Sequence, residues 1–241
     1  MVTVAIIQAR MGSSRLPGKV LRPFVGKSAL AHCVERTRRC AGIDEVIVAT
    51  TTSPGDDLLV EACRAHGWRV ARGPEDDVLG RYYPIAVECG ATEIVRITSD
   101  CPLIDPAVIG DLIATFRAAG ADYGSTSLPR PTFPIGISAE VMTMAALERA
   151  FREDQNPAWR EHVTPYLYRH PELFRLVGHG CDADHTHHRW TLDTPEDAVL
   201  IERLFGELGD TPFTWRDALA VAEAHPEWAH LNAHVVQKQV T

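Results

Sequence analysis

Buried-strand and helical patterns alternate through the first half of the chain. The run Val2–Ile7 is rich in Val and Ile without polar alternation, which is typical of a strand covered on both faces of a parallel sheet. Similar patterns predict strands at Glu45–Thr50, Trp68–Ala71 and Glu93–Thr98. Helices are predicted between and after them at residues 28–40, 56–66, 76–90 and 106–118. This order predicts a parallel sheet with right-handed crossovers.

The regular alternation of strand and helix patterns ends at about residue 121. Residues 123–128 are polar, and Pro129, Pro131 and Pro134 interrupt any helix that follows. Strands are predicted at residues 138–142, 174–178 and 189–192, and helices at 143–153, 159–169, 195–208 and 214–224. With no repeat or low-complexity stretch, we expect a single α/β domain spanning residues 1–241.

The first strand leads into a loop that is suited to binding phosphate. Small residues at Gly12, Ser13 and Gly18 allow backbone N–H groups to surround an anion, and Arg10, Arg15 and Lys19 supply positive charge. The loop matches neither GxxxxGK[ST] nor GxGxxG, which disfavours a P-loop ATPase and a nicotinamide dehydrogenase. The alternative is an ordinary strand–helix connection with a basic surface.

Two aspartates follow predicted strands. Ser99 and Asp100 come directly after Glu93–Thr98, and Asp193 comes after residues 189–192. Ligands of such sheets bind at the carboxyl ends of the strands, so the loop, residues 50–52, Arg72 and both aspartates are expected to meet in one cleft. Two carboxylates beside phosphate oxygens suit Mg²⁺. The alternatives are a turn cap for Asp100 and a helix N-cap for Asp193.

An ordered set of motifs resembles the sugar-activating cytidylyltransferases, the family of CMP-Kdo and CMP-sialic acid synthetases. Within it, the sequence looks most similar to the branch of spore-coat polysaccharide biosynthesis proteins. The resemblance spans nearly the whole chain, to about residue 210. Its motifs are QARMGSSRLPGKVL, EVIVATTT, RGPEDDVLGRY, VRITSDCPLIDP, REHVTPY and RWTLDTPED.

The resemblance implies a three-layer, Rossmann-like nucleotide-diphospho-sugar transferase fold with a mostly parallel sheet. It implies transfer of CMP from CTP to a small acidic acceptor, with release of pyrophosphate and with Mg²⁺ as cofactor. Arg10, Lys19, Asp100 and Asp193 would be catalytic, and the two aspartates would hold the metal. The residues expected to bind CTP are Gln8, Ala9, Arg10, Met11, Gly12, Ser13, Arg15, Lys19, Arg72, Asp77, Arg81 and Ser99.

For the acceptor site, the resemblance implies a lobe and a set of residues but not the identity of the acceptor. It suggests an inserted β-rich lobe at about residues 121–180 that forms a homodimer contact, with Phe133, Ile135, Ile137 and Val141 as its apolar residues. SDCP stands where the Kdo enzymes have a Gln-Gly-Asp-Glu-Pro type of run, and REHVTPY is not a sialic acid synthetase motif, so neither Kdo nor sialic acid is carried over as the acceptor. The residues matching the family's acceptor pocket are Arg130, Glu140, Arg160, His162 and Arg189.

Composition excludes several other classes. With 45% hydrophobic and 23% charged residues and a net charge of −8, the chain is typical of a globular protein and disfavours nucleic-acid binding. No apolar run approaches membrane length, and the six scattered cysteines suggest free thiols, so we expect a cytoplasmic protein without a membrane partner.

Three alternatives remain open. The stretch CDADHTHH, from Cys181 to His188, could bind zinc, although no second ligand pair accompanies it. A metal-dependent glycosyltransferase that uses a nucleotide-sugar would need an Asp-x-Asp motif after the fourth strand, and Asp100 has no such partner. A non-catalytic nucleotide-binding module would not need the set formed by Arg10, Lys19, Asp100 and Asp193.

Overall fold

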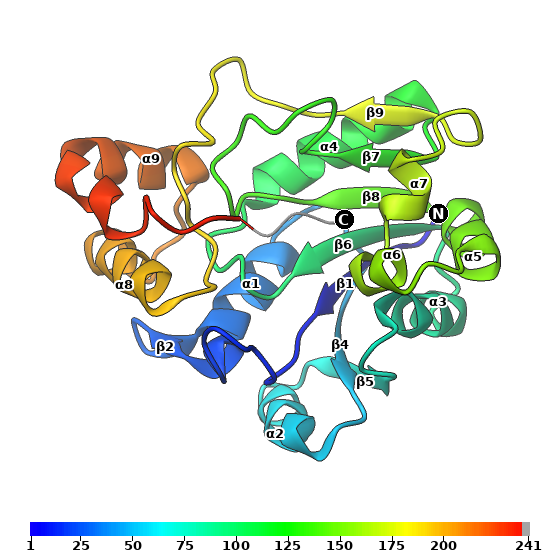
Figure 1. The fold of residues 1–241 in the computed structure, drawn as a ribbon, viewed down its shortest axis with the longest axis horizontal. Coiled ribbons are helices and arrows are strands. Elements are labelled where there is room, and N and C mark those ends of the chain that lie inside the picture. The colour runs from blue at the N-terminus through cyan, green and yellow to red at the C-terminus, as the bar shows by residue number, and fades with distance from the viewer. Residues whose placement is uncertain (238–241) are drawn as a thin grey trace.

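The computed structural model describes residues 1–237, in which a seven-stranded sheet forms the centre (Figure 1). Its order is β5-β4-β1-β6-β8-β7-β9. The strands are β1 (Thr3–Gln8), β4 (Glu45–Thr51), β5 (Arg69–Gly73), β6 (Glu93–Thr98), β7 (Tyr123–Ser125), β8 (Glu140–Thr143) and β9 (Leu176–Gly178), and a separate hairpin joins β2 (Pro23–Phe24) to β3 (Lys27–Ser28).

One strand of the central sheet is reversed. The strand β8 pairs antiparallel with both β6 and β7, whereas the pairs β1–β4, β1–β6, β4–β5 and β7–β9 are parallel. The expected α/β fold with a mostly parallel central sheet is therefore confirmed. The strands predicted at residues 45–50, 68–71 and 93–98 correspond to β4, β5 and β6.

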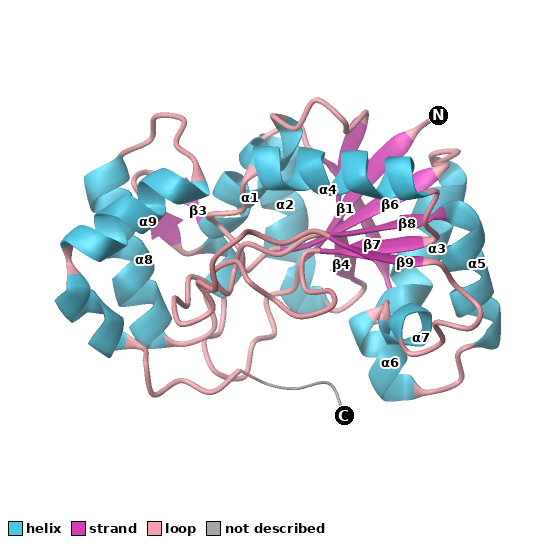
Figure 2. Ribbon diagram, turned by 90° about the horizontal axis from the view of Figure 1, so that it is seen from above, coloured by secondary structure: helices cyan, strands magenta, loops and turns pink. Residues whose placement is uncertain are grey.

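Helices cover both faces of the sheet, which gives three layers (Figure 2). The helices are α1 (Ala29–Arg38), α2 (Asp57–Ala65), α3 (Val78–Glu88), α4 (Pro106–Ala119), α5 (Met144–Glu153), α6 (Pro157–His162), α7 (Pro165–Tyr168), α8 (Pro195–Leu208) and α9 (Trp215–Ala224), with short 3-10 turns at Lys19–Leu21, Pro54–Asp56 and Pro226–Leu231. No helix of residues 1–237 is both long and apolar enough to cross a membrane.

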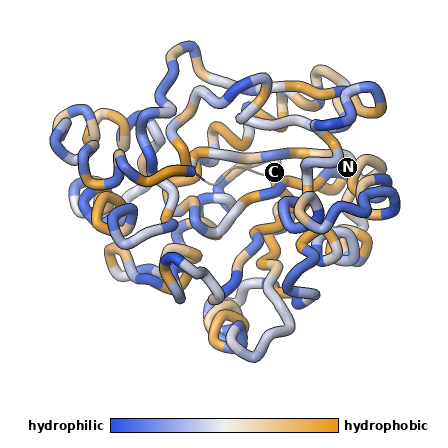
Figure 3. The backbone as a smooth tube through the Cα atoms, viewed as in Figure 1, coloured by the Kyte–Doolittle hydropathy of each residue, from blue (hydrophilic) through white to orange (hydrophobic). Residues whose placement is uncertain are grey.

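The alternation of side chains in β1 builds two cores. Ala5 and Ile7 pack with residues of α1, α2 and α4, and Val4 and Ile6 pack with residues of α3, α5 and α7. Figure 3 shows hydrophobic positions recurring along the central strands, while many outer turns are hydrophilic. A third core joins α8 and α9 to the β2–β3 hairpin. Because β1 is buried on both faces, the loop after Gln8 starts from a rigid position.

The segment 121–180 does not form a sheet of its own. Its strands β7, β8 and β9 extend the central sheet, because β8 hydrogen-bonds directly to β6. Phe133, Ile137 and Val141 are buried within the chain itself, which removes most of the apolar surface on which the dimer prediction rested. The homodimer stays a prediction, now supported by the resemblance alone.

Two expected elements are wrong. The helix at 159–169 is divided into α6 and α7, because Val163 has a φ of 70° and Pro165 starts a new helical turn. Residues 189–192 form no strand of the sheet, only an isolated bridge between Ile135 and Arg189. The apolar side chains of Trp190 and Leu192 are buried in the third core instead.

Candidate active site

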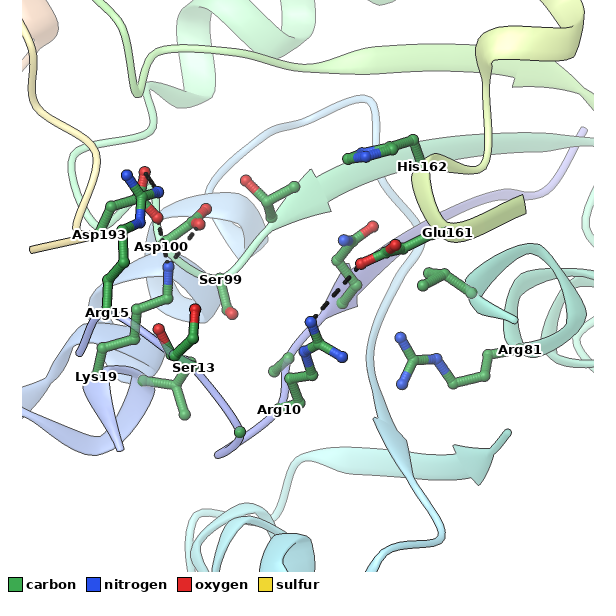
Figure 4. Close-up of a pocket in the computed structure, with 17 residues that line it drawn as sticks. Arg10, Ser13, Arg15, Lys19, Arg81, Ser99, Asp100, Glu161, His162 and Asp193 are labelled. Atoms are coloured by element: carbon green, nitrogen blue, oxygen red, sulfur yellow. Dashed lines mark hydrogen bonds and ion pairs between the residues drawn. The ribbon is translucent and has the colours of Figure 1, made fainter. Parts of the chain in front are cut away.

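A cavity of about 220 Å³ opens at the carboxyl ends of β1 and β6 (Figure 4). Most of the residues expected to bind CTP or metal line it, together with the predicted acceptor residue His162. The expected residues are Gln8, Ala9, Arg10, Gly12, Ser13, Arg15, Lys19, Arg81, Ser99, Asp100, His162 and Asp193; Ser14, Val20, Val78, Thr98 and Glu161 also line it and were not predicted. The cleft deduced from the sheet rule is thus present for the loop and both aspartates, whereas residues 50–52 and Arg72, which were also expected there, do not line it.

A network of backbone bonds fixes the phosphate-type loop. The carbonyl of Met11 accepts from the N–H groups of Ser13 at 2.9 Å and Gly18 at 3.1 Å, and Gly18 adopts a φ of 70°. The N–H of Met11 donates to the buried carboxylate of Asp56 at 2.7 Å. Met11 therefore shapes the loop, whereas its neighbours line the cavity. The sequence pattern did not reveal Asp56, whose role depends on a contact between distant segments.

Lys19 joins the two predicted metal ligands. Its Nζ donates to Asp100 Oδ2 at 2.9 Å and to Asp193 Oδ1 at 2.8 Å. Burial alone would lower the pKa of Lys19, but both carboxylates favour the ammonium and raise the pKa above its usual value. Asp100 and Asp193 therefore converge on one point although 93 positions separate them in the sequence.

Positively charged side chains surround the carboxylate of Asp193. Burial would raise its pKa, but Lys19, Arg15 and Arg189 outweigh that effect and hold the pKa below its usual value. Arg15 Nη2 lies 3.1 Å from Oδ2, and Arg189 Nη2 donates to the same oxygen at 2.8 Å. Asp193 is thus a carboxylate that stays ionised and accessible to the cavity.

A tethered segment, not a strand, brings Asp193 to the site. The N–H of Leu192 donates to the carbonyl of Asp100 at 2.8 Å, and that of Trp190 donates to the carbonyl of Ile135 at 2.6 Å. Gly136 permits this close approach, because a Cβ there would lie 2.7 Å from the Trp190 carbonyl carbon and its φ is 106°. The two aspartates are therefore held together by backbone hydrogen bonds.

The helix-cap alternative for Asp193 fails. Thr194 is the N-cap of α8 and forms a capping box with Asp197. Asp197 is fully buried and also accepts from the backbone N–H of Asp193 and from the guanidinium of Arg189. The predicted acceptor residue Arg189 is therefore a buried support for Asp193, and its Nη1 also donates to Gln237.

Arg81 is the least satisfied polar group in this cavity wall. Its side chain is buried, and its Nε and Nη1 have no hydrogen-bond partner within the described part of the chain. Burial lowers its pKa, and the charge of Arg10 adds to that effect. A buried guanidinium without partners is costly unless a ligand completes it. Arg10 itself lies 3.8 Å from Glu75 and 3.7 Å from Glu161 and is partly exposed.

Several expected residues lie outside the cavity. Arg72 donates to the carbonyls of Thr51 and Ser53 and to Asp57, so it secures the β4–α2 connection. Asp77 caps α3 and pairs with Arg160, which also donates to the carbonyls of Phe151 and Asp154. Arg130 is exposed on the loop before Phe133 and does not reach the cavity. The three expected acceptor arginines are thus not brought together.

Neither Glu140 nor the histidine-rich stretch 181–188 lines the cavity described above. Glu140 lies on β8, where it pairs with Arg96 and faces a second cavity. Cys181 Sγ contacts the carbonyls of Thr132 and Ala183, while the rings of His187 and His188 lie 4.2 Å apart at an angle of 41°. Within residues 1–237, no three His, Cys, Asp or Glu side chains are grouped to hold a metal. The structure gives the zinc alternative no support.

Comparison with known proteins agrees with this fold and site. The family model described as Cytidylyltransferase matches residues 4–225. The spore coat polysaccharide biosynthesis protein SpsF of Bacillus subtilis is 36% identical over 217 residues, covering 86% of this chain and 88% of that protein. The 3-deoxy-manno-octulosonate cytidylyltransferase of Geobacter sulfurreducens is 42% identical over 112 residues, covering 46% of this chain and 43% of that protein.

Solved structures give the same result. A cytidylyltransferase from Leptospira borgpetersenii superposes with a TM-score of 0.91 at 29% identity, covering 99% of this chain and 100% of the other. A CMP:2-keto-3-deoxy-manno-octonic acid synthetase in complex with CTP shares the fold, with a TM-score of 0.66 at 20% identity, covering 86% and 100%. The site and fold thus define a nucleotidyltransferase. More particularly, the chain belongs to the cytidylyltransferase family and is a CTP-dependent cytidylyltransferase.

Proposed function

We propose that the enzyme transfers CMP from CTP to a hydroxyl group of a sugar acid or a related small acceptor in surface-polysaccharide biosynthesis, with Mg²⁺. Family membership supports the reaction, and the names of the relatives support the pathway class. The observation that carries the proposal is the convergence of Asp100 and Asp193 on Lys19 inside a cavity lined by the basic loop.

The reaction requires positioning and charge neutralisation more than covalent catalysis by the protein. The acceptor oxygen forms a bond to the α-phosphorus, the bond between the α-phosphorus and its bridging oxygen to the β-phosphate breaks, and pyrophosphate leaves. The acceptor proton passes to solvent. Arg10, Arg15 and Lys19 line the cavity, and we assign to them the binding of the triphosphate, whose oxygens can also accept from Ser13 and Ser14.

The donor set fits a divalent metal ion. Asp100 and Asp193 offer carboxylate oxygens that lie within hydrogen-bond distance of one nitrogen, so both can face one ion. Two carboxylates completed by phosphate oxygens and water are the usual Mg²⁺ environment. Such an ion would neutralise the charge that develops on the phosphates. A structure described as containing manganese is among the fold's neighbours, with a TM-score of 0.58 at 16% identity.

Base selection is assigned to the other end of the cavity. The unpartnered nitrogens of Arg81 are hydrogen-bond donors that a carbonyl or phosphate oxygen of the nucleotide would complete. Gln8, Ala9 and Arg10 line the same cavity. Together these groups form a compact polar wall that we assign to cytosine and ribose.

Thermal denaturation with different nucleotides tests this proposal. CTP should raise the melting temperature more than equal concentrations of UTP, ATP or GTP, because preferential binding to the folded state stabilises it. UDP-sugars and CDP-sugars, tested in parallel, address the glycosyltransferase alternative. Equal shifts from the four triphosphates would remove base selection, and a larger shift from a nucleotide-sugar would favour the alternative.

A further inference from the structure

The segment that follows α9, drawn in red in Figure 1, contacts the residues that support Asp193. It begins with the 3-10 turn Pro226–Leu231 and continues through Asn232. Asn232 is buried, with only 3% of its surface exposed, although it carries a polar amide. A buried amide needs hydrogen-bond partners, so its contacts show what this segment holds in place.

The amide of Asn232 joins the two residues that hold Asp193. Its Nδ2 donates to Asp197 Oδ1 at 2.8 Å and to the carbonyl of Arg189 at 2.9 Å. Asp197 Oδ1 also accepts from Arg189 Nε at 2.9 Å. One carboxylate oxygen therefore receives both the guanidinium and the amide, and the same amide fixes the backbone of the residue that carries the guanidinium.

Asp197 and Arg189 hold different parts of Asp193. Asp197 Oδ2 accepts from the backbone N–H of Asp193 at 3.0 Å, whereas Arg189 Nη2 donates to Asp193 Oδ2 at 2.8 Å. The other carboxylate oxygen of Asp193, Oδ1, accepts from Lys19, which lines the cavity. The support therefore fixes which oxygen of Asp193 is offered to a cation.

One guanidinium serves two carboxylates in this support. Asp197 is fully buried, so its charge must be met by hydrogen bonds inside the protein. Backbone N–H groups, Arg189 and Asn232 supply these bonds. Without Asn232, Arg189 is drawn further toward Asp197 and away from Asp193. At the far end of the segment, the exposed Gln237 accepts from Arg189 Nη1 and holds the same guanidinium.

We propose that the segment after α9 positions Asp193 for the metal, with Asn232 as its main positioning residue and Gln237 as its second contact. The inference rests on the proposed function, which assigns Asp193 to Mg²⁺. Asn232 does not line the nucleotide cavity and acts only through Asp197 and Arg189. Its loss weakens binding of the cation and leaves metal-free nucleotide binding unchanged.

Calorimetric titration of the full chain with CTP, with and without Mn²⁺ and in the absence of acceptor, tests the proposal. The readout is the gain in CTP affinity that Mn²⁺ provides. Asn232→Ala should lose about tenfold of this gain, because the hydrogen-bond partners of metal ligands commonly have effects of this size on metal affinity. Its affinity for CTP without metal should equal that of the wild type. A wild-type gain in Asn232→Ala overturns the inference.

Two further variants separate positioning from general stability. Thr214→Ala removes the N-cap of α9, which lies in the same core as α8, so it should lower the melting temperature and keep the Mn²⁺ gain. An equal loss of the gain in Thr214→Ala overturns the inference. Gln237→Ala changes an exposed residue, so it should keep the melting temperature and lose part of the gain. If Asn232→Ala does not fold, a wild-type gain in Gln237→Ala overturns the inference.

Asp193→Asn, measured in parallel, distinguishes this inference from the proposed function. If the wild type shows no Mn²⁺ gain, or Asp193→Asn keeps the gain, the metal assignment fails and the inference fails with it. If Asp193→Asn loses the gain and Asn232→Ala keeps it, the metal assignment stands and only the inference is overturned. Loss of the gain in both variants, with metal-free CTP binding intact in Asn232→Ala, supports the positioning role.

Discussion

Lys19 Nζ lies 2.8 Å from Asp193 Oδ1, although 174 positions separate the two residues. The same ammonium lies 2.9 Å from Asp100. Lys19 thus offsets part of the negative charge of the two carboxylates that we assign to the metal. Nucleotide phosphates and Lys19 attract each other, so CTP is expected to free both carboxylates for the cation.

The first prediction is that Lys19 and a divalent cation compete. In the absence of nucleotide, Lys19→Ala should bind Mn²⁺ about tenfold more tightly than the wild type, roughly 1.4 kcal/mol, as measured by electron paramagnetic resonance of the free ion. Lys27→Ala, which removes a lysine paired with Glu35 and Asp210 outside the cavity, is the matched control. Weaker Mn²⁺ binding in Lys19→Ala would contradict the competition.

The second prediction concerns the aspartates. Asp100→Asn and Asp193→Asn should each lower kcat about a hundredfold, or roughly 3 kcal/mol, because each removes a charge needed as pyrophosphate leaves. CTP binding without metal should change little or tighten. The double variant should be much less than additively worse. A near-normal kcat and magnesium dependence in Asp193→Asn would disprove the metal role of that residue.

The third prediction separates two arginines that the sequence grouped together. Arg81→Met should keep or raise the melting temperature, because a buried guanidinium with two unpartnered nitrogens is removed, and should reduce stabilisation by CTP. Arg72→Met should lower the melting temperature, because its three hydrogen bonds are lost, and should leave CTP stabilisation intact. The opposite pattern would show that Arg72, and not Arg81, contributes to nucleotide binding.

The fourth prediction concerns association. By resemblance to the family, we expect a homodimer with a two-fold contact, which is self-complementary. Mass measurement by light scattering at micromolar concentration checks it. A monomeric mass would refute the dimer. That result would agree with the burial of Phe133 and Ile137 inside the chain, which leaves them unable to form a dimer contact.

The sequence was informative where local pattern decides structure. Val4–Ile7 is apolar at every position because both faces of β1 are covered, so this strand could be predicted. The strand β7 was missed because it has only three residues, Tyr123–Ser125, with a glycine at its centre. Residues 189–192 resemble a strand, but their apolar side chains pack against α8 and not within the sheet.

For the site, the sequence could not predict the direction in which each side chain points. The sheet rule placed Arg72 correctly at a strand end, yet its guanidinium turns toward Asp57. Asp56 supports the site through a hydrogen bond from the N–H of Met11, 45 positions away, which no local pattern signals. Asp197 supports Asp193 through the local capping box that it forms with Thr194. The basic loop and the two aspartates could be predicted because their residue types already suit phosphate and metal.

The most direct test of the central claim is phosphorus NMR of CTP incubated with enzyme, Mg²⁺ and a panel of sugar acids, sugar phosphates and phosphonates. The account predicts that one acceptor yields pyrophosphate together with a new CMP-linked product, and that Asp193→Asn forms neither at a comparable rate. Release of inorganic phosphate from the γ-position, or equal consumption of UTP and ATP in place of CTP, would contradict it.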